Sequence, residues 1–223
     1  MLKYKMCLLF LFNLLLLNFN FIRTDALIND LPLFGKVIYI DPGHGGTDPG
    51  AVYKDIYEKN INLSISKELE TKLTSLGAIV YLTRYGDYDL SVTNTINRKR
   101  SDLSRRGNVI NKSNCDLFLS IHLNSEETGI WSGAQVFYDD NNVFNEKIAN
   151  IFQSEFNSNL GSKREYKLVD DLYLQKRITR PGILIEVGFL SNASDRYLLK
   201  QVYYQKKVAS VITNGVLKYF NIK

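Results

Sequence analysis

The chain has 223 residues, of which 45% are apolar and 23% charged. These are the proportions of an ordinary globular protein, and the length suits one α/β domain and is short for two. The formal net charge of +5 owes three basic residues to the first 24 positions, and no Lys/Arg stripe with interleaved aromatic residues accompanies it, so we expect no nucleic-acid partner.

Residues 1–24 have the pattern of an export signal. Lys3 and Lys5 precede an apolar run from Met6 to Ile22. The run is long for the apolar core of a cleaved signal peptide and short for a membrane-spanning helix, so a signal peptide and an uncleaved membrane anchor both stay open. A buried core helix is the structural alternative. Either export interpretation places the rest of the chain outside the cytoplasmic membrane, secreted or membrane-anchored.

The remaining chain divides into a linker at residues 25–35 and one domain at residues 36–223. The linker contains Pro32 and Gly35, which favour turns. Cys115 is the only cysteine of the domain, so no disulfide can form within it.

The first elements of the domain form a strand–helix–strand unit. A β-rich run at 36–40 predicts a strand, and another at 78–83 predicts the next. Between them, apolar residues recur at helical spacing from Glu58 to about Ser75, and Gly77 ends the pattern. Such a unit predicts a parallel strand pair.

The rest of the chain continues the alternation of strands and helices. Predicted strands lie at 116–121, 134–138, 171–175 and 182–186, and predicted helices at 103–111, 143–160, 195–199 and 201–219. We therefore expect a single-domain α/β fold with a mostly parallel central sheet and helices on both faces.

The chain has two histidines, and each follows a predicted strand. His44 comes four residues after Ile40, His122 directly after Ile121, and Glu186 closes a third apolar run. Ligands of open α/β sheets bind beyond the carboxyl ends of the strands, and two histidines with one carboxylate make a catalytic zinc set. For each histidine alone, an ordinary loop or core position is the simpler reading.

Glu186 has a simpler reading too, which is a salt bridge with Arg180 or Arg84. A glutamate at the end of an apolar strand is costly to bury unless it is paired or coordinated.

From about Val37 onward the sequence resembles the zinc-dependent N-acetylmuramoyl-L-alanine amidases of the Amidase_3 family. The resemblance rests on motifs in the family's order: DPGHGGTDPG at 41–50, Glu58, Thr83-Arg84 followed by Asp87, Leu103-x-x-Arg106, SIHLN at 120–124 and EVGFLSN at 186–192. It implies that residues 36–223 are a zinc amidase domain, with the zinc site at the C-terminal edge of the sheet.

The resemblance implies a role for each site residue. His44, Glu58 and His122 would hold one Zn²⁺ per chain, and Glu186 would be the catalytic glutamate. From pattern alone, Asp48 or Asp55 would serve as well as Glu58, whose place at the start of a helix is favoured for any acid. Arg84 and Arg106 would orient the site.

The implied reaction is hydrolysis of the amide bond between N-acetylmuramic acid and L-alanine in peptidoglycan. The zinc would polarise the carbonyl, and Glu186 would move a proton from water to the leaving amine. The runs Glu58-Lys59-x-Ile61-x-Leu63 and Asp87-x-Asp89-Leu90 resemble those of the germination-specific spore amidases, which act on spore cortex on the way to muramic-δ-lactam. This implies a location in the forespore intermembrane space and possible control by a regulatory partner protein.

Three alternatives stay open. The first is a vegetative wall amidase of cell separation or lysis, with the same chemistry. The second is a non-catalytic peptidoglycan-binding protein, and the third a zinc carboxypeptidase acting on the stem peptide. Membrane contact would be made through the N-terminal segment if it is not cleaved.

Overall fold

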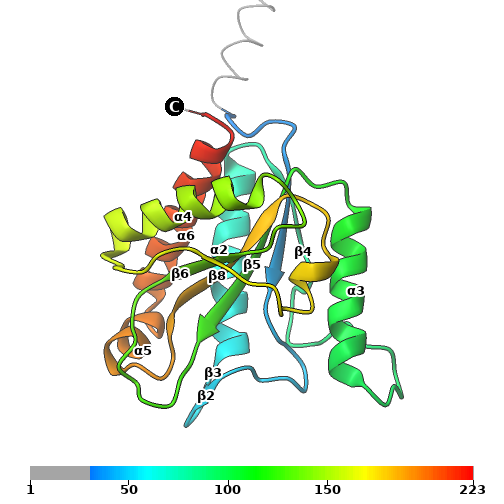
Figure 1. Ribbon diagram of the computed structural model, residues 1–223, viewed down its shortest axis with the longest axis vertical. Helices are drawn as coiled ribbons and strands as arrows, with labels where there is room; N and C mark the ends of the chain where they lie inside the picture. The colour runs from blue at the N-terminus through cyan, green and yellow to red at the C-terminus, as the bar shows by residue number, and fades with distance from the viewer. Residues whose placement is uncertain (1–30, 223) are drawn as a thin grey trace, which may run out of the picture.

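The computed structural model describes residues 31–222, which contain a six-stranded sheet in the order β4-β1-β5-β8-β6-β7 (Figure 1). The strands β4, β1, β5 and β8 are parallel, β6 is antiparallel to β8, and β7 is parallel to β6. Their bounds are β1 (Val37–Pro42), β4 (Ile79–Leu82), β5 (Leu117–Asn124), β6 (Gln135–Tyr138), β7 (Lys167–Leu168) and β8 (Gly182–Phe189). The expected mostly parallel α/β sheet is confirmed.

Helices cover both faces of the sheet. On one face, α2 (Glu58–Ser75), α4 (Asn145–Leu160) and α6 (Val202–Tyr219) pack together with the sheet residues Ile38 and Ile40 to form the main core. On the other, α3 (Arg98–Lys112) and a short 3₁₀ helix, η1 (Gln175–Arg177), cover a smaller core around Phe118. The helix α5 (Ala193–Leu199) follows β8.

The structure differs from the sequence prediction at several element ends. The helix predicted from Leu103 begins at Arg98, because the Asn97 side chain accepts a hydrogen bond from the Arg100 amide and caps the helix. The strands predicted to end at Ile121 and Glu186 run on to Asn124 and Phe189.

Two short elements were not predicted correctly. The strand expected at 171–175 is wrong, because this segment turns into η1 and buries Leu174 against α3. The nearest strand is β7, at Lys167–Leu168. A two-stranded hairpin, β2 (Val52–Tyr53) and β3 (Ile56–Tyr57), precedes α2 without having been expected.

The prediction of a signal peptide or anchor at residues 1–24 lies outside the described residues, as does most of the predicted linker. Within 31–222, no helix is both long and apolar enough to cross a membrane. Leu33 is fully buried in the main core, and its amide donates to the Leu76 carbonyl at 2.8 Å, so the chain enters the fold beside the end of α2.

A candidate metal centre at the strand ends

Three adjacent parallel strands bring the predicted site residues to one edge of the sheet. His44 follows the end of β1, while His122 and Glu186 lie within β5 and β8 and are register partners of each other. Just beyond this pair, Glu186 to Phe189 on β8 stand opposite His122 to Asn124 on β5, so β8 holds one extra residue. Such a bulge re-aims side chains at a strand end.

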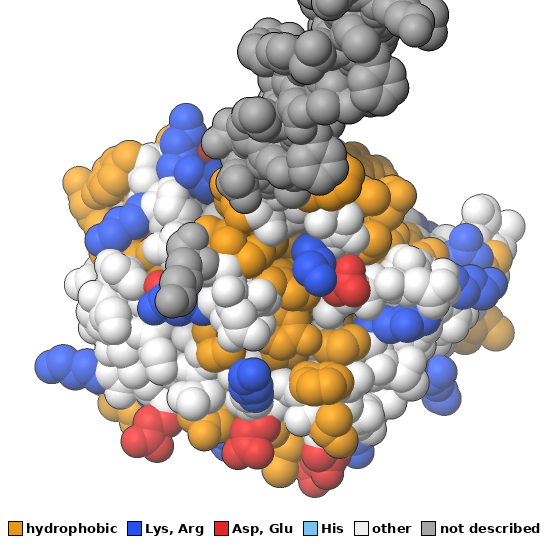
Figure 2. Space-filling model, turned by 90° about the horizontal axis from the view of Figure 1, so that it is seen from above, with side chains coloured by type: hydrophobic (Ala, Val, Ile, Leu, Met, Phe, Trp, Pro, Cys, Tyr) orange, Lys and Arg blue, Asp and Glu red, His pale blue; other side chains and the backbone are white. Residues whose placement is uncertain are grey.

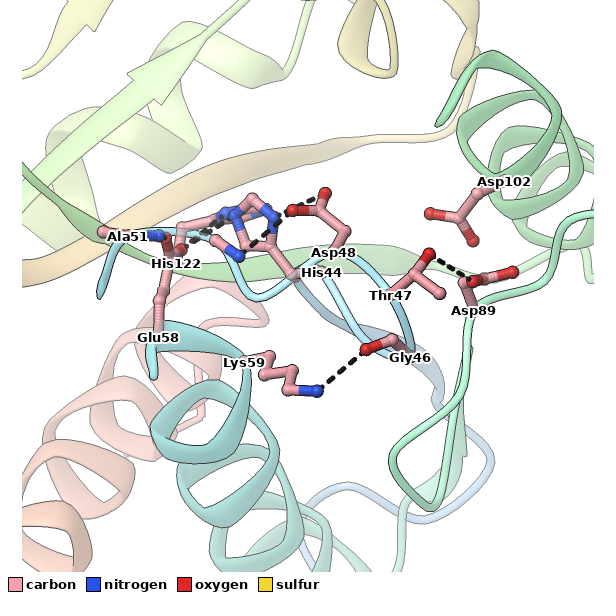
Figure 3. Close-up of polar contacts among 12 residues, drawn as sticks. His44, Gly46, Thr47, Asp48, Ala51, Glu58, Lys59, Asp89, Asp102 and His122 are labelled. Atoms are coloured by element: carbon pink, nitrogen blue, oxygen red, sulfur yellow. Dashed lines mark hydrogen bonds and ion pairs between the residues drawn. The ribbon is translucent and has the colours of Figure 1, made fainter. Parts of the chain in front are cut away.

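Glu58, the first residue of α2, brings its carboxylate between the two histidines (Figure 3). Glu58 Oε1 lies 3.1 Å from His44 Nε2 and 3.1 Å from His122 Nδ1. One ligand atom from each of the three residues lies within 4.8 Å of the others. His44, Glu58 and His122 therefore form a group able to hold a metal ion.

The backbone around Glu58 holds its carboxylate in place. Glu58 Oε1 accepts hydrogen bonds from the Leu123 amide at 3.0 Å and from Asn62 Nδ2 at 3.1 Å, and Oε2 accepts one from the Ala51 amide at 2.8 Å. Burial raises the pKa of Glu58, but the hydrogen bonds from His122 and His44 outweigh this and hold it well below its usual range. The carboxylate is thus ionised, as a ligand must be.

His44 is oriented by a residue that the sequence analysis considered only as a rival ligand. Asp48 Oδ2 lies 2.9 Å from His44 Nδ1, on the side of the ring away from Glu58. Burial lowers the pKa of His44, but the hydrogen bonds to Asp48 and Glu58 outweigh it and raise that pKa to about 9. An Nδ1–H donated to Asp48 leaves Nε2 free as the ligand atom.

Glycines let the polypeptide approach the cluster closely. A Cβ atom on Gly43 would lie 2.2 Å from the His122 ring, and one on Gly50 would lie 2.5 Å from the Glu58 carboxylate. No larger residue fits at either position without moving a cluster residue. His44 itself has a φ of 62°, a conformation that non-glycine residues adopt only when their surroundings hold them there.

Arg84 and Arg106 provide such surroundings, and both are essentially fully buried. Arg106 donates to the carbonyl of His44 at 2.6 Å and to that of Pro42 at 2.9 Å. Arg84 donates to the carbonyls of Pro42 and Gly43 at 3.0 and 2.9 Å. Burial and the neighbouring Arg106 lower the pKa of Arg84 to about 10, which leaves it charged at neutral pH.

Neither salt bridge considered for Glu186 forms. Arg84 is occupied by backbone carbonyls, Arg180 donates to the Asn111 carbonyl, and Glu186 Oε2 is buried without a hydrogen-bond partner among residues 31–222. Burial and the Glu58 charge raise the pKa of Glu186 to about 8. A dication in the cluster would act in the opposite direction and favour the carboxylate.

A cleft of about 170 Å³ opens beside the cluster, on the face of the sheet covered by α3. Both histidines line it, Leu174 and Leu184 add buried apolar surface, and the exposed Lys99 of α3 lines it as well. Lys99 precedes the helix predicted from Leu103 and belongs to none of the motifs, so the sequence alone gave no sign of its place at the cleft.

Comparison with known proteins identifies the family. The N-acetylmuramoyl-L-alanine amidase family profile matches residues 38–218. The germination-specific N-acetylmuramoyl-L-alanine amidase of Bacillus subtilis (strain 168) is 43% identical over 219 residues, or 96% of this chain and 92% of that protein. The amidase LytC of the same strain is 34% identical over 191 residues, or 85% of this chain and 36% of its own.

A solved structure agrees with these relatives. The CwlD amidase from Clostridioides difficile, determined in complex with the GerS lipoprotein, superimposes with a TM-score of 0.80 at 38% identity, covering 85% of this chain and all of that one. Most of the described fold is therefore shared, and the chain belongs to the N-acetylmuramoyl-L-alanine amidase family.

Proposed function

We propose that this amidase uses a zinc ion held by His44, Glu58 and His122 to hydrolyse the amide between N-acetylmuramic acid and L-alanine in spore cortex peptidoglycan. The observation that carries the proposal is the convergence of these three ligands beside Glu186, whose buried Oε2 has no partner among the described residues. A buried carboxylate without a partner is costly, so it needs a functional explanation.

The donor set fits zinc. Two imidazoles and one carboxylate, with room for a fourth ligand, are the ligands of a catalytic zinc site. The three side chains come from separate segments, so the folded chain supplies the site as a whole. When bound there, Zn²⁺ would supply Lewis-acid chemistry, which polarises an amide carbonyl and makes water a stronger nucleophile at neutral pH.

Glu186 is the proposed general base. Its carboxylate accepts a proton as water attacks the amide carbon, and returns that proton to the leaving nitrogen of L-alanine when the C–N bond breaks. Glu186 Oε2 is buried and has no hydrogen-bond partner among the described residues, so no protein group competes for it. Arg84 and Arg106 donate to the backbone carbonyls of Pro42, Gly43 and His44 and so keep His44 in place.

The spore cortex is proposed as the substrate because of the relatives. One relative at 43% identity is named a germination-specific amidase, and the chain aligns with nearly all of it. LytC, at 34% identity, is more than twice as long as the aligned segment. A vegetative wall amidase remains the second candidate, since LytC shares the family and, by the same proposal, would share the chemistry.

The site of action and the partners follow from the same comparison. We propose that residues 1–24 export the chain or anchor it, that 25–35 link this segment to the amidase domain at 36–223, and that the domain works in the forespore intermembrane space. The CwlD of C. difficile is bound to the GerS lipoprotein, and we propose that a regulatory partner protein acts on this chain too.

The test is digestion of purified spore cortex and of vegetative peptidoglycan, with products identified by mass. Released peptides with a free L-alanine amine are expected, chiefly from cortex, and a zinc chelator should abolish them. Glu186→Gln should lower the rate about 10²- to 10⁴-fold, whereas Glu165→Gln, a change at an exposed glutamate, should not. Absence of such peptides from both substrates would refute the amidase proposal, and full activity of Glu186→Gln would refute the assigned base.

A further inference from the structure

The cleft beside the metal cluster has a chemical character of its own. It is bounded by α3 on one side and by the segment 172–175 on the other, and its surface is largely apolar. A second hollow of about 280 Å³, lined by Thr47, Pro49 and Asp89, shares Asp48, Lys99 and Asp102 with it. The two hollows therefore adjoin, and together they form one path that both histidines and Lys99 line.

The acidic residues along this path already have partners. Asp102 receives two hydrogen bonds from Arg106, at 3.0 and 2.9 Å. Asp48 accepts from the Gly50 amide and lies against His44. Asp89 is paired with Arg98 at 2.9 Å.

Lys99 differs from the cations on either side of it. Arg98 is paired with Asp89, and Arg100 donates to the Tyr173 hydroxyl and lies over its ring. Lys99 has no carboxylate within 4.0 Å among residues 31–222, although its charge contributes to lowering the pKa of nearby Asp48. Lys99 therefore lines the path with a positive charge that no carboxylate of the described residues pairs with.

Peptidoglycan contains one component that this charge would recognise. The sugars of the glycan are uncharged once the lactyl carboxyl group is joined in the amide bond, so free carboxylates belong to the stem peptide. We propose that the cleft between α3 and 172–175 receives the stem peptide and that Lys99 pairs with one of its carboxylates. This inference rests on the proposed function and adds the direction in which the substrate lies.

The test compares two soluble muropeptides, one with free stem-peptide carboxylates and the same compound with those groups converted to carboxamides. Lys99→Gln should raise KM for the acidic compound about threefold to tenfold, the range of a partly exposed charged hydrogen bond. The loss should fall on KM rather than kcat, since Lys99 is not one of the residues of the metal cluster, and it should shrink at high salt. The KM for the carboxamide compound should not change.

Two further variants separate charge from fold. Lys99→Arg should have a KM for the acidic compound close to that of the unchanged protein, because arginine keeps the positive charge. Lys112→Gln, at the other end of α3 and outside the cleft, should behave as the unchanged protein. The proposal is overturned if Lys99→Gln alters neither compound or alters both equally while the unchanged protein still cleaves them; if the unchanged protein cleaves neither, the proposed function itself fails.

Discussion

His44 shows how much structure one proposed metal ligand requires. Its ring is held by Asp48 at Nδ1, its carbonyl oxygen by Arg106, and its backbone has a φ of 62°. Asp48 and Arg106, which make these two contacts, are not members of the metal cluster. The position of the ligand atom is therefore set by neighbours that would not touch the metal.

Asp48→Ala is expected to weaken zinc binding about 10- to 100-fold, the usual effect of removing the carboxylate that orients a metal-bound histidine. The dissociation constant would be measured by competition with a chromophoric chelator at constant pH. Asp55→Asn, at an exposed acid of the β2–β3 turn, is the matched control. Equal affinity of Asp48→Ala and the unchanged protein would show that Asp48 does not orient His44.

The site residues differ in how far the sequence could predict them. His44, His122 and Glu186 could be placed at one sheet edge because each follows or ends an apolar strand run, and the structure brings them there. Glu58 could not be chosen over Asp48 or Asp55 from the pattern, since its selection depends on the packing of α2 against β5. Glu58 comes close to the histidines only through the tertiary structure.

Among the elements, a buried ionic network joins β1, β5 and α3 to Thr83, the residue after β4. Asp41 of β1 accepts hydrogen bonds from Arg106 of α3 at 2.8 Å, from Thr83 at 2.6 Å and from Ser120 at 2.9 Å. Burial raises the pKa of Asp41, but the Arg106 charge and the Thr83 hydroxyl outweigh it and hold that pKa below its usual value. The network fixes the end of β1, from which the His44 turn departs.

Arg106→Met is expected to lower the free energy of unfolding by about 3–5 kcal/mol, because it leaves buried Asp41 and Asp102 without their cation. Urea unfolding followed by circular dichroism would measure it. Arg105→Met, at the exposed neighbour on the same helix, should change stability little. A loss of less than 1 kcal/mol in Arg106→Met would show that the network is not structural.

The same network gives a pH dependence. The folded pKa of Asp41 lies below its unfolded value of about 3.8, so its contribution to stability is fully present above that pH. This contribution is lost as the pH falls further, through the folded pKa. In Arg106→Met the depression is removed, so this part of the acid-induced loss of stability should be absent, as urea unfolding at pH 7 and at pH 3 would show.

The sequence predicts an element's ends well where buried apolar residues define the element. It predicts them poorly where a local contact, such as a helix cap, defines the end. The helix α2 runs from Glu58 to Ser75, as its apolar spacing indicates. The first turn of α3 carries Arg98, Lys99 and Arg100, which give no apolar period, and only the Asn97 cap marks its start. The segment 171–175, which was expected to be a strand, instead turns into η1 and buries Leu174.

For the whole molecule, the metal cluster should couple zinc binding to stability, because its ligands come from three separate segments. Zinc at about 100 times its dissociation constant would add about 2.7 kcal/mol, or roughly 5–10 °C in Tm for a domain of this size. Differential scanning fluorimetry with and without a chelator would measure the shift. The same shift in His44→Ala would contradict binding at this cluster.

The two ends of the described chain lie at the pole opposite the metal cluster. Leu33 enters beside the end of α2, and Lys36 stacks on Phe220 with its amine 4.9 Å from the ring centre. Figure 2 views this pole: basic, acidic and apolar side chains are interspersed on it, and neither histidine is visible in the part formed by described residues. The strand β1 runs from one pole toward the other, and its six residues span roughly 20 Å at about 3.3 Å per residue.

This polarity has a practical meaning for work with the protein. A tag, a reporter domain or a solid support joined at residue 31 or 222 would lie at the pole opposite the metal cluster and leave the cleft open to large, insoluble substrates. When it is attached in this way, the domain would present to the substrate the edge of the sheet that carries the metal cluster.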